Sequence, residues 1–117
     1  IIKIADEVKR PYPPDWEAYF AAARWCKTHT ESDAKIMCRK PEFVWFISGR
    51  KAFNYPLTTN KEKMWQAIRK ADYIIIDNFK WTATTYRYLL PAIKDSIKKF
   101  KVLYAVRPST FVIKYEP

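Results

Sequence analysis

The chain has 117 residues, of which 49% are hydrophobic and 17% aromatic, and this composition excludes an intrinsically disordered protein. Twenty-two lysine and arginine residues against 12 acidic ones give a net charge of +10, which points to nucleic acid, an anionic membrane surface or a phosphate-bearing ligand. No uncharged apolar stretch, residues 43–47 included, comes near the roughly 18–20 residues that cross a bilayer.

Residues 1–14 mix charged side chains with three prolines and are predicted to form a lead-in. Because the sequence begins with Ile1 and not with methionine, we expect that a further segment precedes it. A helix is predicted from Asp15, whose side chain suits the N-cap position. Its apolar residues recur at helical spacing: Trp16, Tyr19, Phe20, Ala23 and Cys26.

The middle of the chain alternates between predicted strands and helices. Residues 34–38 alternate apolar with polar side chains and predict a strand. A short helix is expected to begin at Pro41 and to end at Gly49, since proline suits the first helical position and glycine the position just past the end. Residues 51–55 predict a second strand.

Thr59 and Glu62 are predicted to form the capping box of the next helix. The strand that follows, residues 73–77, is almost wholly apolar, as are strands buried on both faces of a parallel sheet. A last helix is predicted from Tyr86 to Ile97, and Pro91 is expected to kink or restart it because proline lacks a backbone N–H.

Residues 102–106 and 111–115 complete the pattern as a predicted β-hairpin. Strands that alternate with helices indicate parallel pairing, with helices on both faces of the sheet. The sequence therefore predicts a single α/β domain over residues 15–117. We expect a three-layer sandwich with a mixed, mostly parallel sheet of about five strands and a C-terminal antiparallel hairpin.

The sequence lacks the motifs of the common catalytic and cofactor-binding sites. Gly49 is the single glycine, which excludes glycine-rich phosphate loops and dinucleotide fingerprints. His29, the single histidine, has no accompanying set of zinc ligands. Cys26 and Cys38 either pair with each other or are free buried thiols, and the second interpretation is favoured. We therefore expect no cofactor, no metal and no catalytic residue.

Polar side chains gather at the carboxyl ends of the predicted parallel strands. Arg39 and Lys40 follow the first strand, Tyr55 ends the second, and Asp77 and Asn78 follow the third. Ligands of open α/β sheets bind at this edge, so these residues are candidate ligand-binding groups. The alternative for Asp77, which the sequence favours, is that its carboxylate only caps the following turn.

Aromatic rings among basic residues also occur in proteins that bind nucleic acid. Most of the rings, however, fall on faces predicted to be buried, and no recognition motif is present. Examples are Trp16, Phe20, Phe43, Trp65 and Tyr86. Trp81, among polar residues, is the ring expected at the surface. A free-standing nucleic-acid-binding domain is therefore the alternative function, and nucleic acid is not the expected partner.

A series of short motifs runs along residues 15–80. In order they are Asp15-Trp16-Glu17-Ala18-Tyr19, Ala23-Arg24-Trp25-Cys26-Lys27, Ser32-Asp33-Ala34-Lys35-Ile36, Arg39-Lys40-Pro41-Glu42, Ser48-Gly49-Arg50-Lys51 and Asp72-Tyr73-Ile74-Ile75-Ile76-Asp77. This order resembles the soluble C-terminal region of bacterial polytopic glycosyltransferases of the mannosyltransferase-like group, which use polyprenyl-phosphate sugars.

The resemblance implies that transmembrane helices precede this domain, and that it lies on the extracytoplasmic, periplasmic face of the bacterial inner membrane. The family's catalytic acidic residues lie in a loop near the start of the full chain, so none is carried over. The implied function is that of an accessory domain that positions a lipid-linked sugar donor or a glycan acceptor. Its expected partners are the transmembrane portion of the same chain, the lipid-linked sugar or an anionic membrane surface. Arg50 joins the candidate ligand-binding residues.

Overall fold

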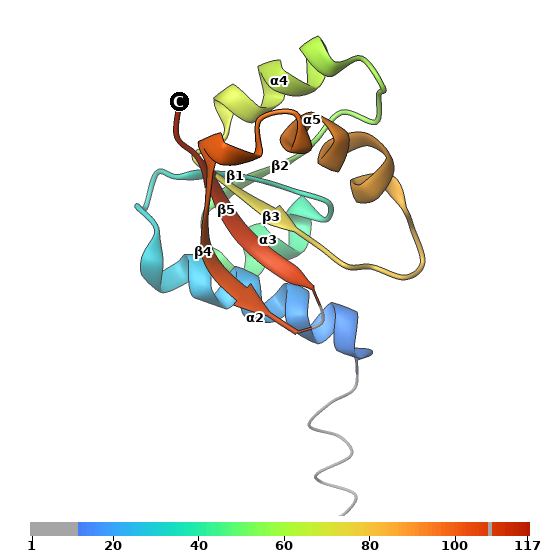
Figure 1. Cartoon of the computed structure of the whole chain (residues 1–117). Coiled ribbons are helices and arrows are strands. Elements are labelled where there is room, and N and C mark those ends of the chain that lie inside the picture. The colour runs from blue at the N-terminus through green and yellow to red at the C-terminus, as the bar shows by residue number, and fades with distance from the viewer. Residues whose placement is uncertain (1–11, 108) are drawn as a thin grey trace, which may run out of the picture.

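In the computed structural model, the chain folds into a five-stranded sheet with helices on both faces (Figure 1). The structure describes residues 12–107 and 109–117. The strands are β1 (Lys35–Cys38), β2 (Lys51–Asn54), β3 (Tyr73–Ile76), β4 (Phe100–Val106) and β5 (Thr110–Tyr115). The helical elements are α2 (Pro14–His29), α3 (Pro41–Ser48), α4 (Lys61–Lys70), a π-helical turn η1 (Thr85–Leu89), α5 (Leu90–Lys94) and a 3-10 turn η2 (Ile97–Lys99). Among the described residues, no helix has the length and apolar character needed to cross a bilayer.

The strand order in the sheet is β2-β1-β3-β5-β4. β1 pairs in parallel with both β2 and β3, whereas β5 runs antiparallel to β3 and to β4. This arrangement confirms the predicted mixed sheet with a C-terminal antiparallel hairpin. All four residues of β3 are buried because the strand lies in the middle of the sheet with helices on both sides.

Different helices cover the two faces of the sheet. In Figure 1, α2 and α3 lie below the sheet, and α4 and α5 lie above it. Tyr19 and Val44 belong to the lower core, while Met64 and Leu89 belong to the upper one, and all four are fully buried. The predicted three-layer arrangement is therefore confirmed. Most of the predicted lead-in, residues 1–14, lies outside the described residues.

The two ends of α3 follow the sequence prediction. The helix begins at Pro41, and Gly49 follows its last residue with a φ of 72°. This left-handed conformation suits glycine because an L side chain there is strained. The predicted capping box of α4 is wrong, since Asn60 takes the N-cap position and its side chain accepts from the Lys63 N–H. Asparagine competes well with threonine for this position.

The last predicted helix is interrupted ahead of Pro91. The Leu90 N–H donates to the Thr85 carbonyl, a π-type bond over five residues, and α5 then continues with Pro91 in its first turn. The prediction that Tyr86 is buried is wrong, since its side chain is 45% exposed. The buried side chains of this segment are those of Thr85, Leu89, Ala92 and Ile93, so the stripe that faces the core begins one residue earlier than predicted. Trp81 is exposed, as predicted.

Both cysteines are buried and free, so the interpretation as thiols is confirmed and a disulfide between them is absent. Cys26 lies on α2 and Cys38 ends β1, and both belong to the core between these elements. Burial raises the pKa of each thiol to about 12. Both side chains are therefore small protonated groups of the core.

Candidate functional site

The chain leaves the neighbouring strands β1 and β3 toward opposite faces of the sheet. After β1 it enters α3 on the lower face, and after β3 it enters η1 and α5 on the upper face (Figure 1). In α/β proteins, ligands bind at such a switch point, at the carboxyl ends of the strands. We call the residues at this place the carboxyl-edge site: Arg39, Lys40, Tyr55, Asn78, Trp81 and Thr84.

Two cations flank the indole of Trp81 at the carboxyl-edge site. The guanidinium carbon of Arg39 lies 5.2 Å from the ring centroid, and Nζ of Lys40 lies 5.9 Å from it. Trp16 stacks on the same indole with a centroid distance of 6.2 Å and an interplanar angle of 11°. The Trp81 side chain nevertheless stays 51% exposed. A ligand at this edge meets an aromatic ring, the Arg39 guanidinium and the Lys40 ammonium, which also pairs with Glu42 at 3.1 Å.

A chain of hydroxyl groups supports Arg39 from below. Arg39 Nε donates to Thr84 Oγ1 at 3.1 Å, and Thr84 Oγ1 lies 2.9 Å from the Tyr55 hydroxyl. Tyr55 in turn lies 2.6 Å from Thr85 Oγ1, which donates to Asp77 Oδ1 at 2.6 Å. Because a carboxylate only accepts hydrogen bonds, each group in the chain donates to the next one. The order of donation runs from Arg39 through Thr84, Tyr55 and Thr85 to Asp77. The network fixes the position of the guanidinium.

Asp77 lies beneath the site and not on its surface. Its side chain is 1% exposed, and its Oδ2 accepts from the Phe79 N–H at 3.2 Å, which closes the turn after β3. Burial raises the pKa of this carboxyl, while the hydrogen bonds from Thr85 and Phe79 oppose the shift. Asp77 therefore acts as a positioning residue, as the turn-capping alternative supposed.

Asn78 and Tyr55 meet the site from two other directions. Asn78 Oδ1 accepts from the Tyr86 hydroxyl at 2.7 Å, which ties the start of the β3–η1 connection to the π turn. The Tyr55 side chain is buried, and burial raises the pKa of its phenol. Tyr55 thus stays neutral and supports Thr84, whereas the half-buried Asn78 lies at the surface of the site.

The structure brings together five of the six candidate residues but not Arg50, so the expectation that Arg50 shares the site is wrong. Arg50 precedes β2, at the opposite edge of the sheet. Its guanidinium donates to the carbonyls of Lys27 and Thr30 at 2.7 and 3.1 Å and to Thr30 Oγ1 at 3.0 Å. These bonds fasten the C-terminus of α2, whose last carbonyls have no helical partner.

Three contributions escaped the sequence prediction. Thr84 and Thr85 were not selected, although a threonine-rich run after a buried strand offers hydroxyl groups for just such a network. Asp15 is not the N-cap, since it lies in the first turn of α2 and its Oδ2 accepts from the Lys80 N–H at 3.0 Å. Asp15 thereby holds the loop that carries Trp81, a long-range contact with no local signal.

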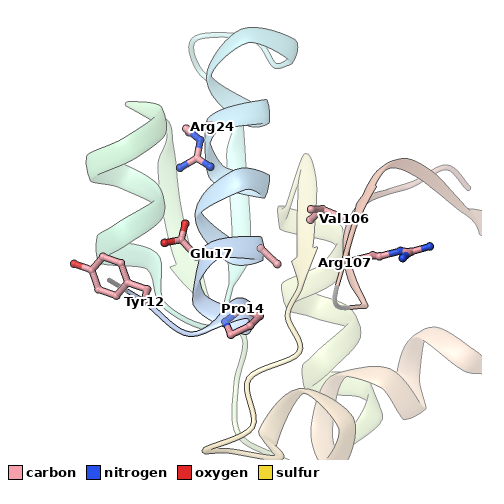
Figure 2. Close-up of a pocket in the computed structure, with 7 residues that line it drawn as sticks. Tyr12, Pro14, Glu17, Arg24, Val106 and Arg107 are labelled. Carbon is pink, nitrogen blue, oxygen red and sulfur yellow. The ribbon is translucent and has the colours of Figure 1, made fainter. Parts of the chain in front are cut away.

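A hollow of about 340 Å³ lies between the N-terminal half of α2 and the end of β4 (Figure 2). Glu17 and Arg24 project from α2, whereas Arg107 comes from the far side and points away from both. Polar groups that fix a ligand converge on one point, and these do not. The carboxyl-edge site is therefore the better candidate.

Neither a protein-family profile nor a curated protein matches this chain. Over residues 12–107 and 109–117, no group of three histidine, cysteine, aspartate or glutamate side chains is placed to hold a metal ion. The carboxyl-edge site itself presents positive charge, hydroxyl groups and one exposed ring.

Proposed function

We propose that this chain is a binding domain for phosphate-bearing sugars, and that it serves as the accessory extracytoplasmic domain of a membrane glycosyltransferase. The observation that carries the proposal is the pair of cations beside the half-exposed indole of Trp81. Guanidinium and ammonium groups bind phosphate oxygens through charge-assisted hydrogen bonds. The exposed part of the indole offers an apolar surface against which the carbon face of a sugar ring packs.

The position of Asp77 supports a role in binding rather than in catalysis. A general acid or base must reach the atom with which it exchanges a proton. Both oxygens of Asp77 already accept hydrogen bonds from the protein, and the side chain is buried. The link to a glycosyltransferase comes from the motif series over residues 15–80, and the parent chain then supplies the catalytic groups from its membrane portion.

Calorimetric titration with a hexose 1-phosphate, the free hexose and inorganic phosphate tests the binding. We expect the sugar phosphate to bind more tightly than either part alone, because ring and cations act together. Trp81→Ala and Arg39→Gln should each weaken its binding about tenfold, equal to about 1.4 kcal/mol. Trp45→Ala is the matched control, since Trp45 is also an exposed tryptophan but lies on α3.

Results of two kinds would contradict the proposal. One kind concerns the sugar phosphate: either it does not bind, or Trp81→Ala and Trp45→Ala weaken its binding equally. The other is tight, strongly salt-dependent binding of a short single-stranded oligonucleotide at the same residues, which would favour the nucleic-acid alternative. The proposal that this domain belongs to a membrane glycosyltransferase has a separate test. The full-length gene must encode transmembrane helices ahead of this domain.

A further inference from the structure

The upper face of the sheet is incompletely covered on the side of the hairpin. α5 has only five residues, and beside it a groove of about 370 Å³ runs over β4 and β5. Its walls are almost entirely apolar and include Tyr86, Leu90, Ile97, Val102 and Phe111. The side chains of Ile97 and Val102 are 59% and 58% exposed. We call these five residues the groove face.

Positive charge borders the groove face. Lys94, Lys98 and Lys99 line a shallow hollow of about 310 Å³ together with Ile97. The carboxylate of Asp95, which lies among these lysines, forms an ion pair with Lys61. The lysines of η2 and α5 therefore surround the exposed Ile97 with a net positive charge. Long lysine side chains also reach past an apolar neighbour to place their ammonium groups in a polar layer.

We propose that the groove face docks on an anionic membrane surface. The charge of the surrounding lysines complements acidic lipid headgroups, and the side chains of Ile97 and Val102 extend into the interfacial layer. Trp45 and Phe46 on α3, which are also exposed, differ in this respect. Glu42 precedes them by three and four residues on the same helix, so the side chain beside them carries a negative charge.

The docking surface goes beyond sugar binding and depends on other residues. Tyr86 connects the two regions, since its ring lines the groove while its hydroxyl donates to Asn78 of the carboxyl-edge site. Docking by the groove face thus brings the carboxyl-edge site toward the headgroup layer. Only this last consequence rests on the proposed function, because the docking itself needs neither Arg39 nor Trp81.

Cosedimentation of the 117-residue chain with lipid vesicles tests the docking. We expect binding to vesicles of phosphatidylcholine with about one third phosphatidylglycerol, and much weaker binding to pure phosphatidylcholine. Each lysine-to-glutamine change at Lys98 or Lys99 should weaken the binding about fivefold. Ile97→Asp and Val102→Asp should each weaken it at least tenfold. Phe46→Asp is the matched control, because Phe46 is 80% exposed on the other face of the sheet.

All of these side chains are exposed, so far-ultraviolet circular dichroism of each variant should match that of the wild type. Equal binding to both kinds of vesicle would overturn the docking surface, and so would equal losses for Ile97→Asp and Phe46→Asp. Arg39→Gln separates the two proposals. If it abolishes sugar phosphate binding but not vesicle binding, the docking surface stands alone, whereas loss of vesicle binding in Arg39→Gln would show that headgroups bind at the carboxyl edge instead.

Discussion

Replacing Asp77 with alanine should strongly destabilise the fold while removing no surface contact. The change deprives the Phe79 N–H and the Thr85 hydroxyl of their acceptor, and both groups are in buried surroundings. A buried polar group without a partner costs about 1–3 kcal/mol, so we expect a loss of about 3 kcal/mol in the free energy of unfolding. This is a large part of the 5–15 kcal/mol typical of a domain.

Urea unfolding followed by tryptophan fluorescence measures the loss at neutral pH. Asp33→Ala is the matched control, since Asp33 is exposed and its replacement should change the free energy by less than about 0.5 kcal/mol. If Asp77→Ala is no more destabilising than Asp33→Ala, the hydroxyl chain beneath the carboxyl-edge site does not support the fold as we argue.

The pH dependence of the same measurement tests the cause of the Asp77 pKa shift. Burial raises this pKa above its ordinary value of 3.8, so the native state holds the proton more firmly than the unfolded chain does. The stabilisation from the proton is complete below pH 3.8 and disappears as the pH rises through the raised pKa. Wild type should therefore lose stability over this window relative to Asp77→Asn, which does not titrate. A gain instead would mean that the hydrogen bonds outweigh burial.

Two further predictions concern residues away from the site. Arg50→Ala should lower the free energy of unfolding by about 2 kcal/mol, since it removes charge-assisted bonds to Thr30 and the end of α2, yet leave hexose 1-phosphate affinity unchanged. Urea unfolding of the variant measures the loss of stability, and calorimetric titration measures the affinity. A loss of affinity would show that Arg50 takes part in binding after all. Cys26 and Cys38 should react with an aromatic disulfide reagent only as fast as the domain unfolds, because both are buried with pKa values near 12. Fast labelling in native buffer would contradict their burial.

The elements that the sequence predicts well carry a local chemical constraint. Pro41 suits the start of α3 because the first helical residues need no backbone N–H donor. Gly49 suits its end because glycine tolerates a φ of 72°. The apolar run at 73–76 can only lie in the middle of a covered sheet, and it does. From such elements and their order, the place of Arg39 and Asp77 at the carboxyl edge follows without coordinates, whereas the switch point needs the strand order of the structure.

The features that the sequence does not predict depend on contacts between distant segments. The bond from the Lys80 N–H to Asp15 joins residues far apart in the chain, and nothing in either neighbourhood announces it. The bonds from Arg50 to Lys27 and Thr30 likewise join distant segments, although the place of Arg50 before the strand already puts it at the amino edge of the sheet. Tyr86 illustrates the third case, because helical spacing fits a stripe that begins at Tyr86 as well as one that begins at Thr85, and packing selects the second.

The π turn η1 links the two proposed surfaces in physical terms. Proline at position 91 cannot donate to the carbonyl four residues before it, and the turn ahead of it widens to a five-residue bond. Tyr86 in this turn is 45% exposed, and its side chain both lines the apolar groove and donates to Asn78 at the carboxyl edge. Tyr86 thus joins the groove face to the carboxyl-edge site.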